Sequence, residues 1–197
     1  MSLSRNMPMS TVAFAAALLT GCTVTTGGEA VKAHHDLIPV ENAGDDTASV
    51  LVRDILTDIV AYWEGRGVGL GNVRFSQWDS GKGDRAPECR GSTFPQPAYC
   101  SEGWLAWDRA WVTKAQRHGK STPIMYASRA VADAVADRAG VPYDPLRAVS
   151  IQECLTGAYL ADSADSTSRE IRKYITDTSA YVRGLMSDDP VRDCVWS

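Results

Sequence analysis

Residues 46–79 read DTASVLVRDILTDIVAYWEGRGVGLGNVRFSQWD, and this stretch indicates the class of fold. In its first half, four large apolar residues recur at spacings of three, four and four, which puts them on one face of a helix: Val52, Ile55, Ile59 and Trp63. Asp46 can cap the start of this helix, and glycines follow its end. In its second half, the alternating segment 73–79 predicts a strand. A long amphipathic helix followed by a strand indicates mixed α and β structure.

The rest of the chain is expected to be mostly helical. A second short strand is predicted at 105–107, and the segment 80–103, which contains Gly and Pro, is expected to be an irregular loop. Four further segments have the apolar spacing and boundary residues of helices: 109–118, 123–138, 146–162 and 167–185. The predicted class is α+β, a helix-dominated domain with a short strand pair.

The composition excludes two classes of protein. The chain has 197 residues, of which 44% are hydrophobic, and a formal net charge of −4. This apolar content is too high, and this charge too low, for a disordered chain, and the length is sufficient for one globular core. Nucleic acid is not an expected partner, because a phosphate-binding surface needs an excess of Lys and Arg.

The N-terminal segment has the features of a bacterial lipoprotein precursor. Residues 1–21 are predicted to be a signal peptide, whose short apolar run at 12–19 leads into Leu-Thr-Gly-Cys at Cys22. This tetrapeptide resembles the lipobox, whose cysteine receives a diacylglyceryl group on the thiol and usually an acyl chain, such as palmitate, on the freed amine. Two or three acyl chains anchor a protein stably. We therefore expect attachment to the lipid bilayer through acylated Cys22, on the extracytoplasmic face of the cell membrane.

Residues 22–46 are predicted to form the acylated, flexible tether between this anchor and the domain at 47–197. The tether segment is polar and rich in small residues, and it has no sustained periodicity. His34 and His35 lie within it. A histidine pair can bind a metal ion, but two solvated side chains are expected in a flexible tether.

The cysteine count agrees with export. Four cysteines follow Cys22, and an even number in an oxidising compartment predicts disulfide bonds. Four cysteines allow three pairings, and proximity in sequence favours Cys89 with Cys100 and Cys154 with Cys194.

Several short motifs, taken in order, resemble a bacterial family of neutral zinc metallopeptidases. They are Glu88–Gly91 (ECRG), Ala98–Cys100 (AYC), Trp107–Asp108, Ile151–Ala158 (IQECLTGA), Tyr181–Gly184 (YVRG), Asp189–Pro190 and Cys194. The resemblance covers about residues 50–197 and implies a zincin-like fold. In that family a helix carries His-Glu-x-x-His, and a carboxylate near the Cys-x-x-Gly segment of the next helix completes the zinc site.

The chain departs from the family at the metal site. The two histidine positions are occupied by Arg129 and Asp133, the glutamate position by Ala130, and the third ligand position by Val149. Arginine is a permanent cation, and alanine offers no base. We therefore expect a domain without catalytic or metal-binding residues and without a cofactor. His118 is the only histidine after residue 35, and a solvated side chain is expected for it.

Two alternatives remain open for the charged side chains of this region. Arg129 and Asp133 are four residues apart on a predicted helix, so they can form an ion pair where the zinc ion would lie. Asp133, Asp137 and Glu153 can instead supply oxygen ligands to a cation.

Three tryptophans lie within eight residues, at positions 104, 107 and 111. Trp104 and Trp107, with Asp108, are candidates to line the former substrate cleft and to hold a ligand by stacking. Burial in the core is the competing interpretation for these rings. The strand before Asp108 is expected to be an edge strand, which could pair with an extended peptide.

Three functions follow from these features. The leading hypothesis is a membrane-anchored lipoprotein whose inactive metallopeptidase-like domain binds a peptide, a protein or a cell-envelope component. The second is an active metallopeptidase with a non-standard zinc site that includes Asp133 and Glu153. The third is a structural lipoprotein of the cell envelope.

Overall fold

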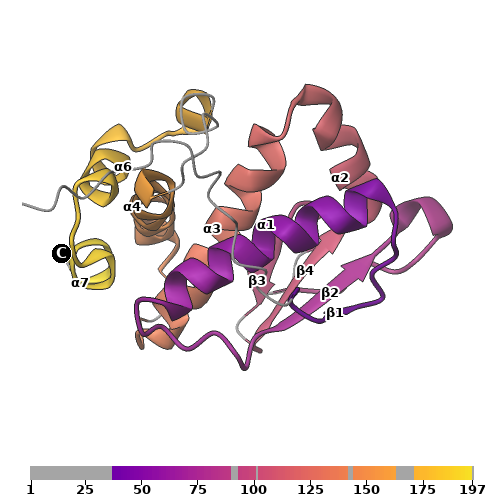
Figure 1. Cartoon of the computed structure of the whole chain (residues 1–197), viewed down its shortest axis with the longest axis horizontal. Coiled ribbons are helices and arrows are strands. Elements are labelled where there is room, and N and C mark those ends of the chain that lie inside the picture. The colour runs from indigo at the N-terminus through magenta and orange to yellow at the C-terminus, as the bar shows by residue number, and fades with distance from the viewer. Residues whose placement is uncertain (1–36, 90–92, 101, 142–143, 163–170, 197) are drawn as a thin grey trace, which may run out of the picture. The chain divides into compact units, whose positions relative to one another are not determined.

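The computed structural model describes residues 37–89, 93–100, 102–141, 144–162 and 171–196 (Figure 1). The α-helices among these residues are α1 (Thr47–Glu64), α2 (Arg109–Ala115), α3 (Ser121–Arg138), α4 (Pro145–Asp162), α6 (Thr178–Leu185) and α7 (Pro190–Val195). The strands are β1 (Val40–Glu41), β2 (Arg74–Trp78), β3 (Ala98–Cys100) and β4 (Trp104–Asp108). The predicted α+β class with dominant helices is confirmed.

The sheet is larger than the predicted strand pair. Its four described strands lie in the order β1-β2-β4-β3, with β1, β2 and β4 parallel and β3 antiparallel to β4. Strands β1 and β3 have only two and three residues, so neither is long enough to show alternation in the sequence. Because β4 lies between β2 and β3, the expectation that the strand before Asp108 is an edge strand is wrong.

Helix α1 follows the predicted pattern. Its four stripe residues are all buried: Val52, Ile55, Ile59 and Trp63. The side chain of Asp46 caps the helix by accepting from the backbone N–H of Ala48 at 3.1 Å. The stripe packs into one hydrophobic core with α3 and with Phe75 and Leu105 of the sheet. The spacing of apolar residues therefore placed this helix correctly.

The described end of the predicted tether belongs to the fold. Val40 and Glu41 pair with β2 as strand β1, and the backbone N–H of Ile38 donates to Thr57 Oγ1 at 3.1 Å. The ordered domain therefore begins before residue 47, because a two-residue strand is sufficient to add this segment to the sheet. Residues 1–36, which include the predicted signal peptide, Cys22, His34 and His35, lie outside the described residues.

The C-terminal helices differ in part from the prediction. The described part of the segment 167–185 contains a short 3-10 helix, η3 (Arg172–Tyr174), and then α6, instead of one continuous helix. Ile175 is extended, and Asp177 caps α6 by accepting from the backbone N–H of Ala180. Helix α7 begins at a proline behind the cap residue Asp189, where no helix was predicted.

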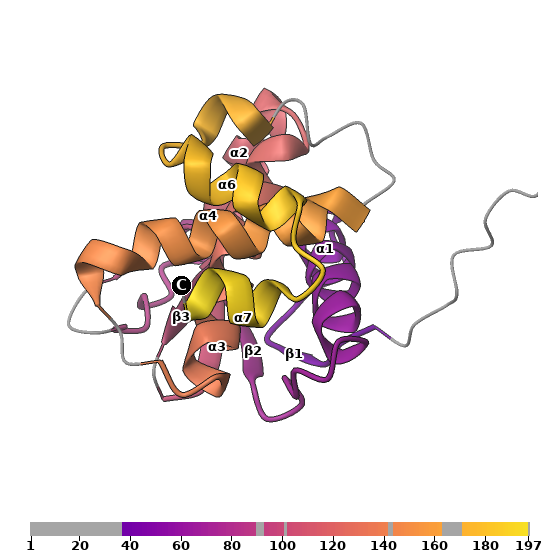
Figure 2. The ribbon, with the colours of Figure 1, turned by 90° about the vertical axis from the view of Figure 1, so that its left-hand side faces the viewer.

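Both favoured disulfide bonds are confirmed. Cys89 joins Cys100 beside β3 and β4, and Cys154 on α4 joins Cys194 on α7. The second bond links helices that lie side by side with α6 (Figure 2). All four cysteines of the domain are therefore paired.

None of the helices in the described part of the chain has the length and apolar character needed to cross a membrane.

Two glycines allow α4 and α6 to pack closely. A Cβ atom on Gly184 of α6 would overlap the carbonyl oxygen of Cys154, and a Cβ atom on Gly157 of α4 would overlap that of Tyr181. The two helix backbones are therefore in direct contact, which explains why both positions need a residue without a side chain.

We predict that Gly157→Ala and Gly184→Ala each lower the free energy of unfolding by about 2–3 kcal/mol, because the added carbon separates the helices. In an unobstructed helix the same change would raise stability by about 1 kcal/mol. Urea unfolding followed by circular dichroism measures the difference. Gly71→Ala is the control, since a Cβ atom there meets no atom within 4 Å. Unchanged stability of both helix variants would show that the helices can separate at little cost.

Candidate functional site

The residues at the predicted metal-site positions differ in their burial. Arg129, Ala130 and Asp133 are on α3, and Val149 is on α4. Ala130 is buried in the hydrophobic core, whereas Val149 is 45% exposed to solvent.

Arg129 forms an ion pair with Glu153, a partner that the sequence did not predict. Its Nη2 atom lies 2.5 Å from Oε1 of Glu153 and donates a second hydrogen bond, 3.1 Å long, to the carbonyl oxygen of Tyr174. Glu153 is completely buried, and the Arg129 side chain is 20% exposed. The pair joins α3 to α4 because the long arginine side chain reaches across the helix interface instead of along its own helix.

Glu153 is held by three further hydrogen bonds. The backbone N–H and the hydroxyl of Thr176 each donate to Oε1 at 2.8 Å, and the backbone N–H of Asp177 donates to Oε2. A buried carboxylate is stable only with partners of this kind. Glu153 therefore fastens the segment before α6 to α4 and to Arg129.

The carboxylates proposed as a cation site have separate partners. Asp133 accepts from the side-chain amide of Gln152 at 2.9 Å, and Asp137 accepts from the hydroxyl of Tyr99 at 2.7 Å. Glu153 is occupied by the contacts above. Within the described ranges, no three or more His, Cys, Asp or Glu side chains are grouped so that they could hold a metal ion.

The side chains at the family's metal positions do not fit a zinc ion. A zinc site needs nitrogen, sulfur or oxygen donors that converge on one point. Ala130 and Val149 have no donor atom, Asp133 is bonded to Gln152, and the Arg129 guanidinium brings a fixed positive charge.

The residues proposed to line a cleft have structural roles. Trp107 is completely buried, and its indole N–H donates to Oε1 of Gln77 at 3.2 Å, so it cannot stack on a ligand. Asp108 is also buried; it caps α2 through the backbone N–H of Ala110 and accepts from the hydroxyl of Ser80 at 2.6 Å. These two assignments to a cleft are wrong, because β4 lies inside the sheet.

Trp104 and Trp111, the other two tryptophans of the cluster at 104–111, are partly buried. Trp104 borders a cavity of about 10 Å³ beside the Cys89–Cys100 disulfide, which is about the size of one water molecule and too small for a peptide. Trp111 packs edge-to-face on Tyr126, with ring centres 5.1 Å apart. Core packing is thus the better interpretation of this cluster. His118 is exposed at the end of the 3-10 helix η2 (Gln116–His118), as expected.

Arg109, the first residue of α2, bridges two carboxylates. Its Nε atom lies 2.8 Å from Oδ2 of Asp46, and Nη1 lies 2.9 Å from Oδ2 of Asp79. Burial tends to raise the pKa of Asp46, but hydrogen bonds from Arg109 and Ser49 outweigh it and hold this pKa well below 3.8. The network ties the start of α1 to the ends of β2 and β4.

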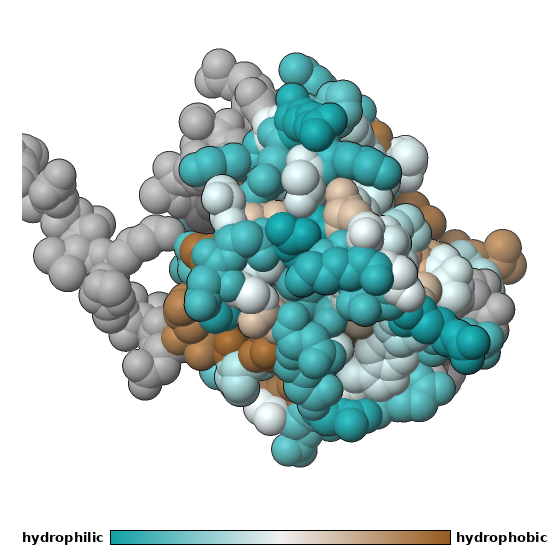
Figure 3. Space-filling model, turned by 90° about the vertical axis from the view of Figure 1, so that its right-hand side faces the viewer, coloured by the Kyte–Doolittle hydropathy of each residue, from teal (hydrophilic) through white to brown (hydrophobic). Residues whose placement is uncertain are grey.

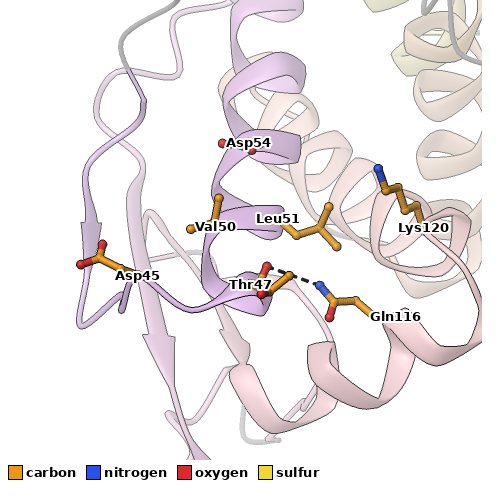
Figure 4. Close-up of a pocket in the computed structure, with 7 residues that line it drawn as sticks. All are labelled: Asp45, Thr47, Val50, Leu51, Asp54, Gln116 and Lys120. Carbon is orange, nitrogen blue, oxygen red and sulfur yellow. Dashed lines mark hydrogen bonds between the residues drawn. The ribbon is translucent and has the colours of Figure 1, made fainter.

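A groove beside α1 was missed by sequence reasoning. It has a volume of about 540 Å³ and lies along the first two turns of α1 (Figure 4). Helix α1 contributes Thr47, Val50, Leu51 and Asp54, which share one face at positions i, i+3, i+4 and i+7. This second periodic face was present in the sequence next to the core stripe. We call this cavity the α1 groove.

We predict that Arg129→Met lowers the free energy of unfolding by about 3–5 kcal/mol, because it leaves Glu153 buried without its cation. In a double-mutant cycle, the double variant with Glu153→Met should cost less than the sum of the two single variants. Arg192→Met is a matched control, because Arg192 pairs with Asp193 while it is 69% exposed, and little change is expected. Additive costs in the cycle would contradict a coupled pair.

We predict a pH-dependent effect of Asp46→Asn. Asparagine can still cap α1 but has no charge for Arg109. Because folding lowers the pKa of Asp46, its contribution is fully present above the unfolded pKa of about 3.9 and is lost as the pH falls below that value. Unfolding experiments from pH 7 to pH 2 should therefore show the wild type and the variant converging in acid. A stability gap that stays constant with pH would contradict this role.

Comparison with family models, with curated proteins and with solved structures finds no match to this chain. The function is therefore argued from the residues of the chain and their arrangement.

Proposed function

We propose that the protein is a bacterial lipoprotein, anchored through acylated Cys22 on the extracytoplasmic face of the cell membrane. Its domain binds a peptide, a protein or a cell-envelope component and does not hydrolyse it. The zincin-like character of the domain belongs to the same proposal.

The pairing of the cysteines supports export and anchoring. The two disulfide bonds account for four of the five cysteines, all of them in the domain, and the fifth is Cys22. Disulfide bonds persist in oxidising compartments, which agrees with a signal peptide. Cys22 also stands at the end of Leu-Thr-Gly-Cys, where lipidation would use its thiol. This observation is the main support for the proposal.

The chemistry at the former metal positions supports binding without hydrolysis. A metallopeptidase needs a glutamate beside its first histidine to take a proton from the attacking water. The corresponding residue is Ala130, and its neighbour Arg129 is paired with Glu153. The guanidinium thus supplies a positive charge close to Glu153 without offering an open coordination position.

Anchoring is tested by expressing the full chain in a bacterium fed with an alkyne-labelled palmitate analogue. We expect the wild type to carry the label and to stay in the membrane fraction when the membranes are washed with high salt. We also expect the precursor to accumulate when lipoprotein signal peptidase is inhibited. Cys22→Ser is the matched control and should carry no label. Equal labelling of both proteins, or no labelling of either, would contradict the anchor.

Hydrolysis is tested on the purified exported protein by metal analysis together with a peptidase assay on a mixed peptide library. We expect zinc far below one equivalent and no cleavage that EDTA removes. Stoichiometric zinc with EDTA-sensitive cleavage that Asp133→Ala abolishes would establish the active peptidase instead.

A further inference from the structure

The α1 groove lies on a second face of α1, whose apolar residues Val50 and Leu51 are only partly buried. The core stripe of this helix runs through Val52, Ile55 and Ile59. Val50 and Leu51 line the groove, and Leu51 also packs against the edge of the core. Gln116 of η2 and Lys120, just before α3, form the opposite wall. The groove is therefore built by one helix and by the connection between two others.

Charges of both signs border the groove without partners. Within the described part of the chain, the side chains of Asp45, Asp54 and Lys120 have no ion pair or hydrogen bond. By contrast, the neighbouring carboxylate of Asp46 is bonded to Arg109. The charges at the rim are thus free to pair with a ligand.

The charges lie on opposite sides of the apolar floor. Figure 4 shows Asp45, Val50 and Asp54 on one side of α1 and Leu51 and Lys120 on the other. A bound molecule that crosses the helix would thus meet carboxylates first, then apolar side chains, and then an ammonium group. A ligand of a single charge would be repelled at one of the two sides.

The dimensions suit a short peptide. The volume of about 540 Å³ lies in the usual range of small-ligand sites. Hydrophilic residues cover most of the face of the molecule in Figure 3, and apolar residues show there in small groups.

We propose that the α1 groove binds a short extended peptide with a cationic side chain, an apolar side chain and a carboxylate in succession. The cation pairs with Asp45 or Asp54, the apolar side chain covers Val50 and Leu51, and the carboxylate pairs with Lys120. This inference rests on the proposed function, since it names the binding site and the ligand class for that activity.

The test titrates acetyl-Lys-Leu-Glu-amide into the ¹⁵N-labelled chain from residue 22 onward, carrying Cys22→Ser and oxidised so that both disulfide bonds form. Blocked termini leave only the side-chain charges. We expect chemical-shift changes at 45–54 and 116–120, with weak, saturable binding at low salt. Acetyl-Lys-Ser-Glu-amide, which lacks the apolar side chain, and acetyl-Glu-Leu-Glu-amide should bind more weakly.

A charge reversal with rescue makes the test specific. Lys120→Glu should weaken binding of acetyl-Lys-Leu-Glu-amide about two- to fivefold, the size expected for an exposed ion pair. It should strengthen binding of acetyl-Lys-Leu-Lys-amide, because the new carboxylate replaces the ammonium. Lys82→Glu, on an exposed lysine outside the groove lining, makes the same change in net charge and should alter neither affinity.

The outcomes separate the groove from the proposed function. No binding of any probe, shift changes that map elsewhere, or equal effects of Lys82→Glu and Lys120→Glu would overturn the groove assignment and leave the lipoprotein proposal standing. EDTA-sensitive cleavage of the probe would overturn the proposed function. The groove assignment would then be decided by the chemical-shift changes alone. Rescue limited to Lys120→Glu supports the groove.

Discussion

Direct backbone contact between α4 and α6 is the constraint on which the C-terminal half depends. Gly157 and Gly184 allow this contact, and a side chain at either position would overlap a carbonyl oxygen of the partner helix. Close approach of the two helices places Glu153 where it can accept hydrogen bonds from Thr176 and Asp177 at the start of α6. The Cys154–Cys194 bond then ties α7 to the same helix. Glu153, Cys154 and Gly157 thus connect one short part of α4 to the helices that follow it.

The ion pair of Arg129 and Glu153 connects this helical part to α3. In water such a pair would contribute little, but Glu153 is completely buried, so loss of its cation would leave an unpaired charge in the interior. The position that a zinc ligand occupies in the resembling family thus holds a guanidinium. A permanent cation can hold a buried carboxylate in place, as a metal ion can, but it cannot activate water. This difference is the physical basis for proposing a domain that binds without hydrolysing.

Local patterns predicted the helices well and the sheet poorly. The stripe from Val52 to Trp63 and the cap at Asp46 are contacts within one helix, so spacing alone reveals them. Strands β1 and β3 are too short for a periodic signal and exist only through pairing with β2 and β4. For the same reason, sequence reasoning placed Trp107 and Asp108 at an exposed edge, whereas β3 covers that side of β4. The second face of α1 was visible in the sequence, but only the tertiary structure shows that it lines a groove with Gln116 and Lys120.

The sequence by itself determined the helix-dominated α+β class and the disulfide pairs, because residue spacing and proximity in the chain govern both. It also determined that the chain lacks the two histidines and the glutamate of the peptidase motif, because this depends only on residue identity. Only the tertiary structure decided that Arg129 pairs with Glu153 and that Asp133 is bonded to Gln152. Side chains on one helix compete with partners on neighbouring helices, and the packing of α3 against α4 determines which partner is within reach.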